Sequence, residues 1–139
     1  VEPVLGKWRY LALFLVSGLG GAVGSYLFAN PFDEAVGASG AIFGLFGAYF
    51  VLARRASANT SGIVVLIVIN LVFSFSVPGI AWQDHVGGLV TGLVVAAGLG
   101  LARHGRHRQE VIADVAVLAA TCVALGLLLL LPPGVVNLG

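Results

Sequence analysis

Two side chains in this sequence, a serine and a histidine, are of the types that hydrolytic enzymes use together. Ser39 lies between glycines in Gly37-Ala38-Ser39-Gly40 and precedes a long apolar run, and His85 begins another apolar run. A serine hydroxyl is a weak nucleophile until an adjacent base takes its proton, and histidine is the usual base. If the fold brings Ser39 and His85 together, the pair has the chemistry for acyl transfer.

The composition is typical of a membrane protein. The 139 residues are 59% hydrophobic and 9% charged, and the mean hydropathy is +1.05, whereas a soluble domain has about 25% charged residues. The net charge of +1 gives no indication of a nucleic-acid partner. The single cysteine, Cys122, excludes an intrachain disulfide and is interpreted as a packing residue.

Residue usage also bears on the source and on the extent of the chain. Six of the seven basic residues are arginine, and alanine, glycine, valine and leucine dominate, which favours a GC-rich bacterial source. The chain contains no methionine. We therefore expect it to be a fragment of a longer protein or a processed chain.

Five apolar segments predict helices that enter or cross a bilayer. They cover Tyr10–Phe28, Ser39–Ala53, Gly62–Val77, Trp82–Ala102 and Val111–Leu131. A full transmembrane helix needs about 20 apolar residues, a length that the first, fourth and fifth segments reach. The second and third are shorter, so they must thin the bilayer or begin below its surface. The sequence thus predicts an all-α polytopic membrane protein with five transmembrane helices.

The basic residues predict how these helices are oriented. They form three clusters, before the first segment, at the end of the second and between the fourth and fifth: Lys7 and Arg9, Arg54 and Arg55, and Arg103, Arg106 and Arg108. If the helices alternate in direction, all three clusters lie on one side, which the positive-inside rule makes the cytoplasm. The loop 30–36, the turn 78–81 and the tail from Pro132 then lie on the outer side.

This topology places the serine and the histidine at similar depth. Ser39 begins the second helix and His85 lies near the start of the fourth, both counted from the outer side. Small residues four apart let helix backbones come close, and each of the two helices has such a pair: Gly40 and Gly44, and Gly88 and Gly92. A histidine needs this closeness to reach a serine hydroxyl at about 2.6–3.2 Å.

Other interpretations of these residues stay open. Ser39 could cap its helix, and His85 could be a hydrogen-bonded residue between helices, although an ionisable residue inside a span is a functional hypothesis by default. Adjacent helix positions do not face each other, so we expect Asp84 to have a capping or loop role and not to complete a triad. His104 and His107 have no carboxylate or cysteine at metal-binding spacing, so we predict a basic interfacial loop and no metal.

The two motifs resemble those of the rhomboid intramembrane serine proteases. The resemblance covers about residues 5–104 and rests on two stretches, with support from Arg9-Tyr10-Leu11, Ser17-Gly18 and Asn70-Leu71: Gly37-Ala38-Ser39-Gly40-Ala41-Ile42-Phe43-Gly44 and His85-Val86-Gly87-Gly88-Leu89-Val90-Thr91-Gly92. It implies a Ser–His dyad that hydrolyses transmembrane proteins near the outer membrane face. Ser39 would be the nucleophile, and His85 the general base and then the general acid.

The resemblance also implies roles for neighbouring residues. The backbone N–H of Ser39, at a helix N-terminus, would help to hold the oxyanion, in an active-site loop that includes Gly37 and Gly40. Phe43 stands where many bacterial members have a tyrosine, and its ring would pack beneath the histidine without a hydrogen bond. Phe73, Phe75 and the Pro78-Gly79 turn would belong to the mobile elements that admit substrate.

The chain departs from the family pattern at its front. Rhomboid proteases have two helices before the first one seen here, and the second of these carries a histidine and an asparagine that complete the oxyanion hole. No histidine precedes His85, and no His-x-x-x-Asn occurs. Loss of one oxyanion donor costs about 10²–10³ in rate. We therefore predict a partial protease core over residues 1–104 and an additional C-terminal transmembrane helix and tail over residues 105–139.

The predicted function is that of a rhomboid-like intramembrane serine endopeptidase in the bacterial cytoplasmic membrane. Its predicted partners are transmembrane protein substrates and the lipid bilayer, without a cofactor, a metal or nucleic acid. One alternative is a non-catalytic rhomboid-like protein that binds transmembrane clients, and another is an inactive fragment without the oxyanion-hole helix. A channel or transporter subunit would need a charged pore pattern, which the sequence lacks.

Overall fold

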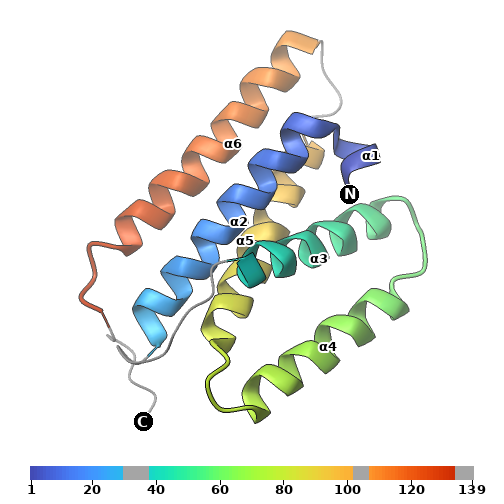
Figure 1. The fold of residues 1–139 in the computed structure, drawn as a ribbon. Coiled ribbons are helices and arrows are strands. Elements are labelled where there is room, and N and C mark those ends of the chain that lie inside the picture. The colour runs from blue at the N-terminus through green and yellow to red at the C-terminus, as the bar shows by residue number, and fades with distance from the viewer. Residues whose placement is uncertain (30–37, 102–106, 134–139) are drawn as a thin grey trace.

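The computed structural model describes residues 1–29, 38–101 and 107–133. These residues form six helices (Figure 1): α1 Glu2–Leu5, α2 Lys7–Phe28, α3 Ala38–Arg55, α4 Ser61–Ser76, α5 Trp82–Leu101 and α6 His107–Leu128. The five helices predicted from the apolar segments are all present, with ends that differ from the prediction by a few residues. The short α1 was not predicted, because four residues are too few to show an apolar period; Pro3 lies in its first turn, where proline is favoured.

Helices α2, α3 and α5 pack together at the centre of the bundle (Figure 1). Glycines set the distance between α3 and α5: a Cβ added at Gly88 would overlap the carbonyl oxygen of Gly40, and one at Gly92 would overlap that of Gly44. The two backbones are therefore in direct contact over two turns, as expected for small residues four apart. This contact holds the start of α3 beside the start of α5.

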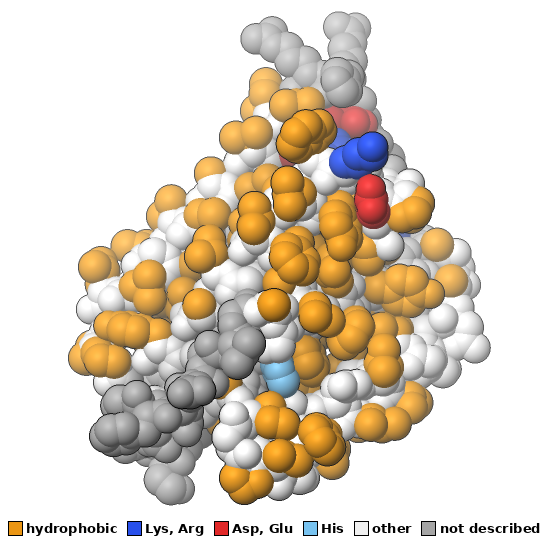
Figure 2. Space-filling view, in the orientation of Figure 1, with side chains coloured by type: hydrophobic (Ala, Val, Ile, Leu, Met, Phe, Trp, Pro, Cys, Tyr) orange, Lys and Arg blue, Asp and Glu red, His pale blue; other side chains and the backbone are white. Residues whose placement is uncertain are grey.

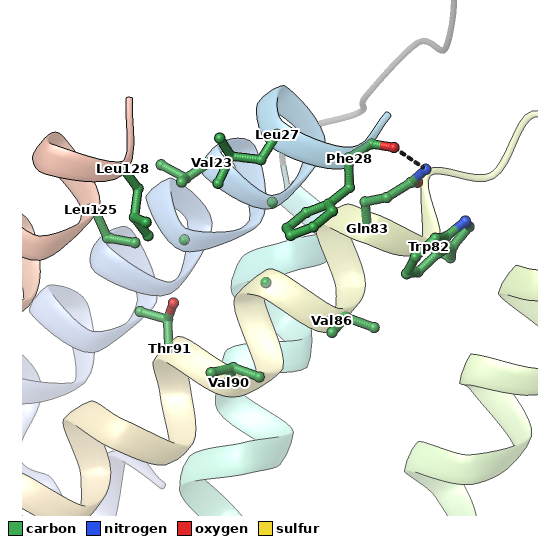
Figure 3. Close-up of a pocket in the computed structure, with 13 residues that line it drawn as sticks. Val23, Leu27, Phe28, Trp82, Gln83, Val86, Val90, Thr91, Leu125 and Leu128 are labelled. Atoms are coloured by element: carbon green, nitrogen blue, oxygen red, sulfur yellow. Dashed lines mark hydrogen bonds between the residues drawn. The ribbon is translucent and has the colours of Figure 1, made fainter. Parts of the chain in front are cut away.

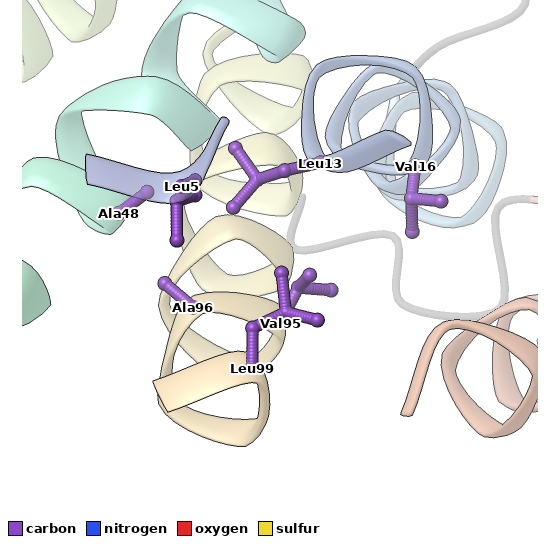
Figure 4. Close-up of a cluster of buried hydrophobic side chains, with 7 residues drawn as sticks. All are labelled: Leu5, Leu13, Val16, Ala48, Val95, Ala96 and Leu99. Carbon is purple, nitrogen blue, oxygen red and sulfur yellow. The ribbon is translucent and has the colours of Figure 1, made fainter. Parts of the chain in front are cut away.

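The buried apolar cluster lies toward the other end of these helices (Figure 4). Its members come from α1, α2, α3 and α5: Leu5, Leu13, Val16, Ala48, Val95, Ala96 and Leu99. Leu13, Val95 and Ala96 are fully buried or nearly so. This cluster thus lies away from the starts of α3 and α5, where glycines form the contact between the two helices.

Ionic and polar contacts identify which helix ends lie together. In α2, Nε of Arg9 donates a hydrogen bond of 2.6 Å to Asp114 of α6, and Arg9 also lies 3.8 Å from Glu110. In α3, Nη2 of Arg55 donates to the carbonyl oxygen of Ala97 in α5 at 2.8 Å. The starts of α2 and α6 therefore share one end of the bundle with the ends of α3 and α5, as alternating helices require.

The surface also has one charged end. On the visible face in Figure 2, Lys, Arg, Asp and Glu gather near one end and hydrophobic side chains cover most of the rest. The predicted basic cluster at 103–108 and the outer loop 30–36 lie outside the residues whose side chains the structure describes. The charged residues exposed on this face thus mark one end of the bundle.

Two of the described helices are long and apolar enough to cross a membrane: α2 and the segment Gln109–Leu128 of α6. They differ in surroundings, because 50% of the apolar window of α2 is buried inside the protein but only 6% of that of α6. Large exposed apolar areas on a protein mark a membrane or a partner. The exposure of α6 is that expected of a helix facing lipid.

Helix α4 is the most loosely held of the long helices. It lies at the edge of the bundle beside α3 and α5 (Figure 1). All its residues are described, and Ser74 is the only one that is buried. The attachment of α4 to the centre of the bundle therefore depends on the side chains around Ser74.

Candidate active site

Ser39 is the second residue of α3 and is partly exposed. Its Oγ donates a hydrogen bond of 2.7 Å to Oδ2 of Asp84, in the first turn of α5. The first turn of a helix has backbone N–H groups without partners inside the helix and the positive end of the helix dipole. Gly37, which we expected in the active-site loop, lies outside the described residues.

The contact between Ser39 and Asp84 was not predicted. The expected capping or loop role of Asp84 is wrong, because this side chain is 1% exposed and lies where α2, α3 and α5 meet. Residues four apart share a helix face, so Asp84 lies on the same face of α5 as Gly88, which contacts α3. That spacing was the signal that could have placed Asp84 beside Ser39.

Two glycines make room for the carboxyl group of Asp84. A Cβ added at Gly40 would lie 2.9 Å from Oδ1, and one at Gly21 would lie 2.5 Å from the same atom. Both distances are too short for a real side chain, so the carboxyl group fits because both positions are glycine. Within the described residues, Oδ1 is buried without a hydrogen-bond partner.

His85 and Asp84 contact different residues, as expected for adjacent helix positions. Nδ1 of His85 lies 2.6 Å from Oγ of Ser74 in α4, and Ser74 in turn donates to the carbonyl oxygen of Asn70 at 2.7 Å. A hydroxyl group has one proton, so Ser74 must accept from Nδ1–H. We assign the neutral tautomer from this network: Nδ1 has the proton and Nε2 has the lone pair that a general base uses.

The His85 ring stacks on Phe43, as expected for an aromatic residue at that position. The ring centroids are 4.3 Å apart and the rings are inclined by 14°. Phe43 lies one turn after Ser39 on the same face of α3. The structure thus brings the imidazole to the face of α3 that carries Ser39, while the two side chains make hydrogen bonds to Asp84 and Ser74.

An apolar cavity lies between α2, α5 and the end of α6 (Figure 3). Its volume is about 350 Å³. Its lining has no acidic, basic or histidine side chain: Gly20, Val23, Gly24, Leu27, Phe28, Trp82, Gln83, Val86, Gly87, Val90, Thr91, Leu125 and Leu128. Gln83 donates to the carbonyl oxygen of Phe28 at 3.3 Å at its edge. The cavity therefore offers packing for apolar groups and no acid or base.

The described residues contain no group of three His, Cys, Asp or Glu side chains that could hold a metal ion. His104 and the side chain of His107, for which a basic loop was predicted, lie outside the described part of the chain. The chemistry available at the start of α3 and α5 is therefore that of a hydroxyl, an imidazole and a carboxyl group.

Comparison with known proteins identifies several relatives. The Bacillus subtilis protein "Rhomboid protease GluP" is 40% identical over 124 residues, which cover 86% of this chain and 24% of that protein. "Putative rhomboid protease YdcA" of the same organism is 37% identical over 102 residues, or 69% of this chain and 51% of that protein. "RHOMBOID-like protein 4" of Arabidopsis thaliana is 31% identical over 111 residues, or 75% and 28%. The chain thus spans a quarter to a half of the length of these relatives, and no solved structure matches it.

A match to a protein-family model agrees with these relatives. The rhomboid domain matches residues 1–102, which include α1 to α5 and therefore both motif stretches. The all-α bundle and its exposed apolar helices agree with a family of polytopic integral membrane proteins. The chain belongs to the rhomboid family.

Proposed function

We propose that the chain carries a Ser–His dyad of an intramembrane serine endopeptidase, with Ser39 as the nucleophile and His85 as the general base. The observation that carries this proposal is the placement of the imidazole. It stacks on Phe43, one turn from Ser39 on the same helix, and its Nδ1 is engaged by Ser74. That arrangement leaves Nε2 as the proton acceptor, which is the state that a serine-activating histidine needs.

The reaction follows from these groups. The Ser39 hydroxyl turns to His85, and Nε2 takes its proton as Oγ attacks the substrate carbonyl. The oxyanion forms near the backbone N–H of Ser39, where the N-terminus of α3 favours negative charge. The imidazolium then gives its proton to the leaving amine, and water releases the acyl group by the reverse sequence. Throughout, Ser74 accepts from Nδ1–H and keeps the ring in place.

The proposed substrates are transmembrane proteins cut near the outer face of a bacterial cytoplasmic membrane. Ser39 and His85 lie at the helix ends opposite those of Arg9 and Arg55, and basic residues favour the cytoplasmic side. In this arrangement five helices cross the membrane: α2 to α5 form a partial protease core within residues 1–104, and α6 is an additional helix within 105–139. The boundary between these two parts, at residues 104 and 105, lies outside the described residues.

The topology has a direct test. In the intact protein, a reporter fused after Arg55 should be cytoplasmic and one fused after Pro78 should be external, because α4 crosses the membrane between them. Paired fusions of green fluorescent protein and alkaline phosphatase distinguish the two locations. If both fusion points report the same side, the five-helix arrangement is wrong.

Replacement of Ser74 tests the proposed tautomer. Ser74→Ala removes the acceptor for Nδ1–H, so we expect kcat for a transmembrane substrate to fall roughly tenfold, about the net value of one hydrogen bond. The KM should change little, because Ser74 orients His85 and is not proposed to contact substrate. Ser74→Thr keeps the hydroxyl and should restore most of the rate. Equal rates for wild type and Ser74→Ala would contradict the orienting role.

A further inference from the structure

A buried carboxyl group touches the proposed nucleophile, and the dyad mechanism has no use for it. Asp84 is 1% exposed, and its Oδ2 accepts the hydrogen bond of 2.7 Å from Ser39. Its side chain comes from α5, the helix of His85, but the imidazole of His85 makes its hydrogen bond to Ser74. The hydrogen bond between Asp84 and Ser39 is therefore separate from the one that His85 makes to Ser74 in α4.

Packing does not account for a carboxyl group at this position. The space between Gly21 and Gly40 is just large enough for it, and within the described residues Oδ1 has no hydrogen-bond partner. A buried polar atom without a partner is destabilising, and such an atom in a native structure calls for an explanation. An apolar side chain would pack in the same interface without that cost. The contact with Ser39 is what distinguishes aspartate here.

The contact with Asp84 determines where the hydroxyl proton of Ser39 points. A serine hydroxyl has one proton, and in the structure Ser39 donates it to Asp84. That proton is not available to His85 until the hydroxyl turns. Hydrogen bonds to a carboxylate are stronger than those between neutral groups. A negative charge beside Ser39 also opposes the oxyanion that must form near its N–H.

We propose that Asp84 is a positioning residue that holds Ser39 in a resting orientation, with its hydroxyl proton directed away from His85. The inference rests on the proposed dyad. In the resting state the serine is held between α3 and α5, and attack on a carbonyl requires the exchange of the Asp84 hydrogen bond for one to His85. Asp84 thus slows the reaction of Ser39 with any acyl donor or serine-directed reagent.

The test is the rate at which a fluorophosphonate probe labels Ser39 in the intact membrane-inserted protein. Asp84→Ala removes the competing acceptor, and we expect labelling about tenfold faster or more, the value of a hydrogen bond to a charged group. Asp84→Asn keeps the size of the side chain but makes only a neutral hydrogen bond, so its rate should lie between wild type and Asp84→Ala. For a transmembrane substrate, the rise should appear in kcat with KM unchanged, because Asp84 is buried away from substrate.

Two controls separate this inference from the dyad. Asp114→Asn makes the same chemical change in another buried aspartate, which lies in α6 and pairs with Arg9 of α2, and it should leave the labelling rate unchanged. Adding His85→Ala to each Asp84 variant should abolish labelling if the dyad is correct. If labelling needs His85 but is no faster in Asp84→Asn and Asp84→Ala than in wild type, the proposed role of Asp84 is wrong and the dyad stands. Labelling that is indifferent to His85 overturns the dyad.

The isosteric variant keeps the test decisive if Asp84→Ala fails to fold. Asp84→Asn fits the same space between the two glycines, so its membrane insertion and thermal unfolding should match those of wild type. If Asp84→Ala does not fold, the labelling rate of Asp84→Asn relative to that of wild type is sufficient to test the role of Asp84. A slower rate in Asp84→Asn would mean that the carboxyl group assists the reaction, and the restraining role would be wrong.

Discussion

Replacement of either Ser39 or His85 by alanine should abolish cleavage of a transmembrane substrate. The two residues act as one unit, because the hydroxyl is a poor nucleophile without a base and the base has no role without the hydroxyl. Each single variant should lose on the order of 10⁴-fold or more in kcat, and the double variant should lose no more than the single ones. The measurement is cleavage in reconstituted vesicles, with equal amounts of inserted protein.

A serine outside the site provides the matched control. The Oγ of Ser76 donates to the carbonyl oxygen of Val72 within α4, and Ser76→Ala should cleave at the wild-type rate. If His85→Ala retained substantial cleavage, the imidazole would not be the base. If both alanine variants bound the substrate normally and wild type did not cleave it, the client-binding alternative would take the place of the protease.

Gly88→Leu should also remove activity, for a geometric reason. Even a Cβ at Gly88 would overlap the carbonyl oxygen of Gly40, so a leucine must push α5 away from α3. A displacement of about 1 Å at reacting groups can cost 10²-fold in rate, and overpacking costs about 1–3 kcal/mol of stability. We expect at least a hundredfold loss of cleavage in a protein that still inserts into the membrane.

The control and a graded variant make this prediction specific. A Cβ at Gly126 in α6 would meet nothing within 4 Å, so Gly126→Leu should insert and cleave as wild type does. Gly88→Ala should cause a smaller loss than Gly88→Leu, because a single methyl group demands a smaller shift. Wild-type cleavage by Gly88→Leu would mean that the close approach of α3 and α5 is not needed for function.

The helices could be predicted from the sequence because their residues are apolar on every side. Such runs have no other stable state in lipid than a helix, whose backbone hydrogen bonds are internal. Glycines spaced by four also pointed correctly to the contact of α3 with α5. The position of α6 beside α2 could not be predicted, because it depends on a hydrogen bond between Arg9 and Asp114, which are far apart in the chain.

The hydrogen bonds of the candidate site were harder to predict than its main residues. Adjacency to His85 argues against a contact between Asp84 and the imidazole, but the spacing of four from Gly88 places Asp84 on the face of α5 that contacts α3. Ser74 had no sequence relation to His85 that would indicate contact, since the pairing arises only when α4 packs beside the start of α5. Residue types and spacing can indicate a nucleophile and a base, whereas the groups that orient them depend on tertiary packing.

The central claim is that Ser39 is activated by His85, and covalent labelling tests it most directly. The intact protein in membranes is treated with a fluorophosphonate, and the modified residue is identified by mass spectrometry in wild type and in His85→Ala. We expect an adduct on Ser39 in wild type, none in Ser39→Ala, and a loss of at least a hundredfold in labelling rate in His85→Ala, the range that a general base contributes. An adduct on Ser39 that forms equally fast without His85 would contradict the claim that His85 activates Ser39.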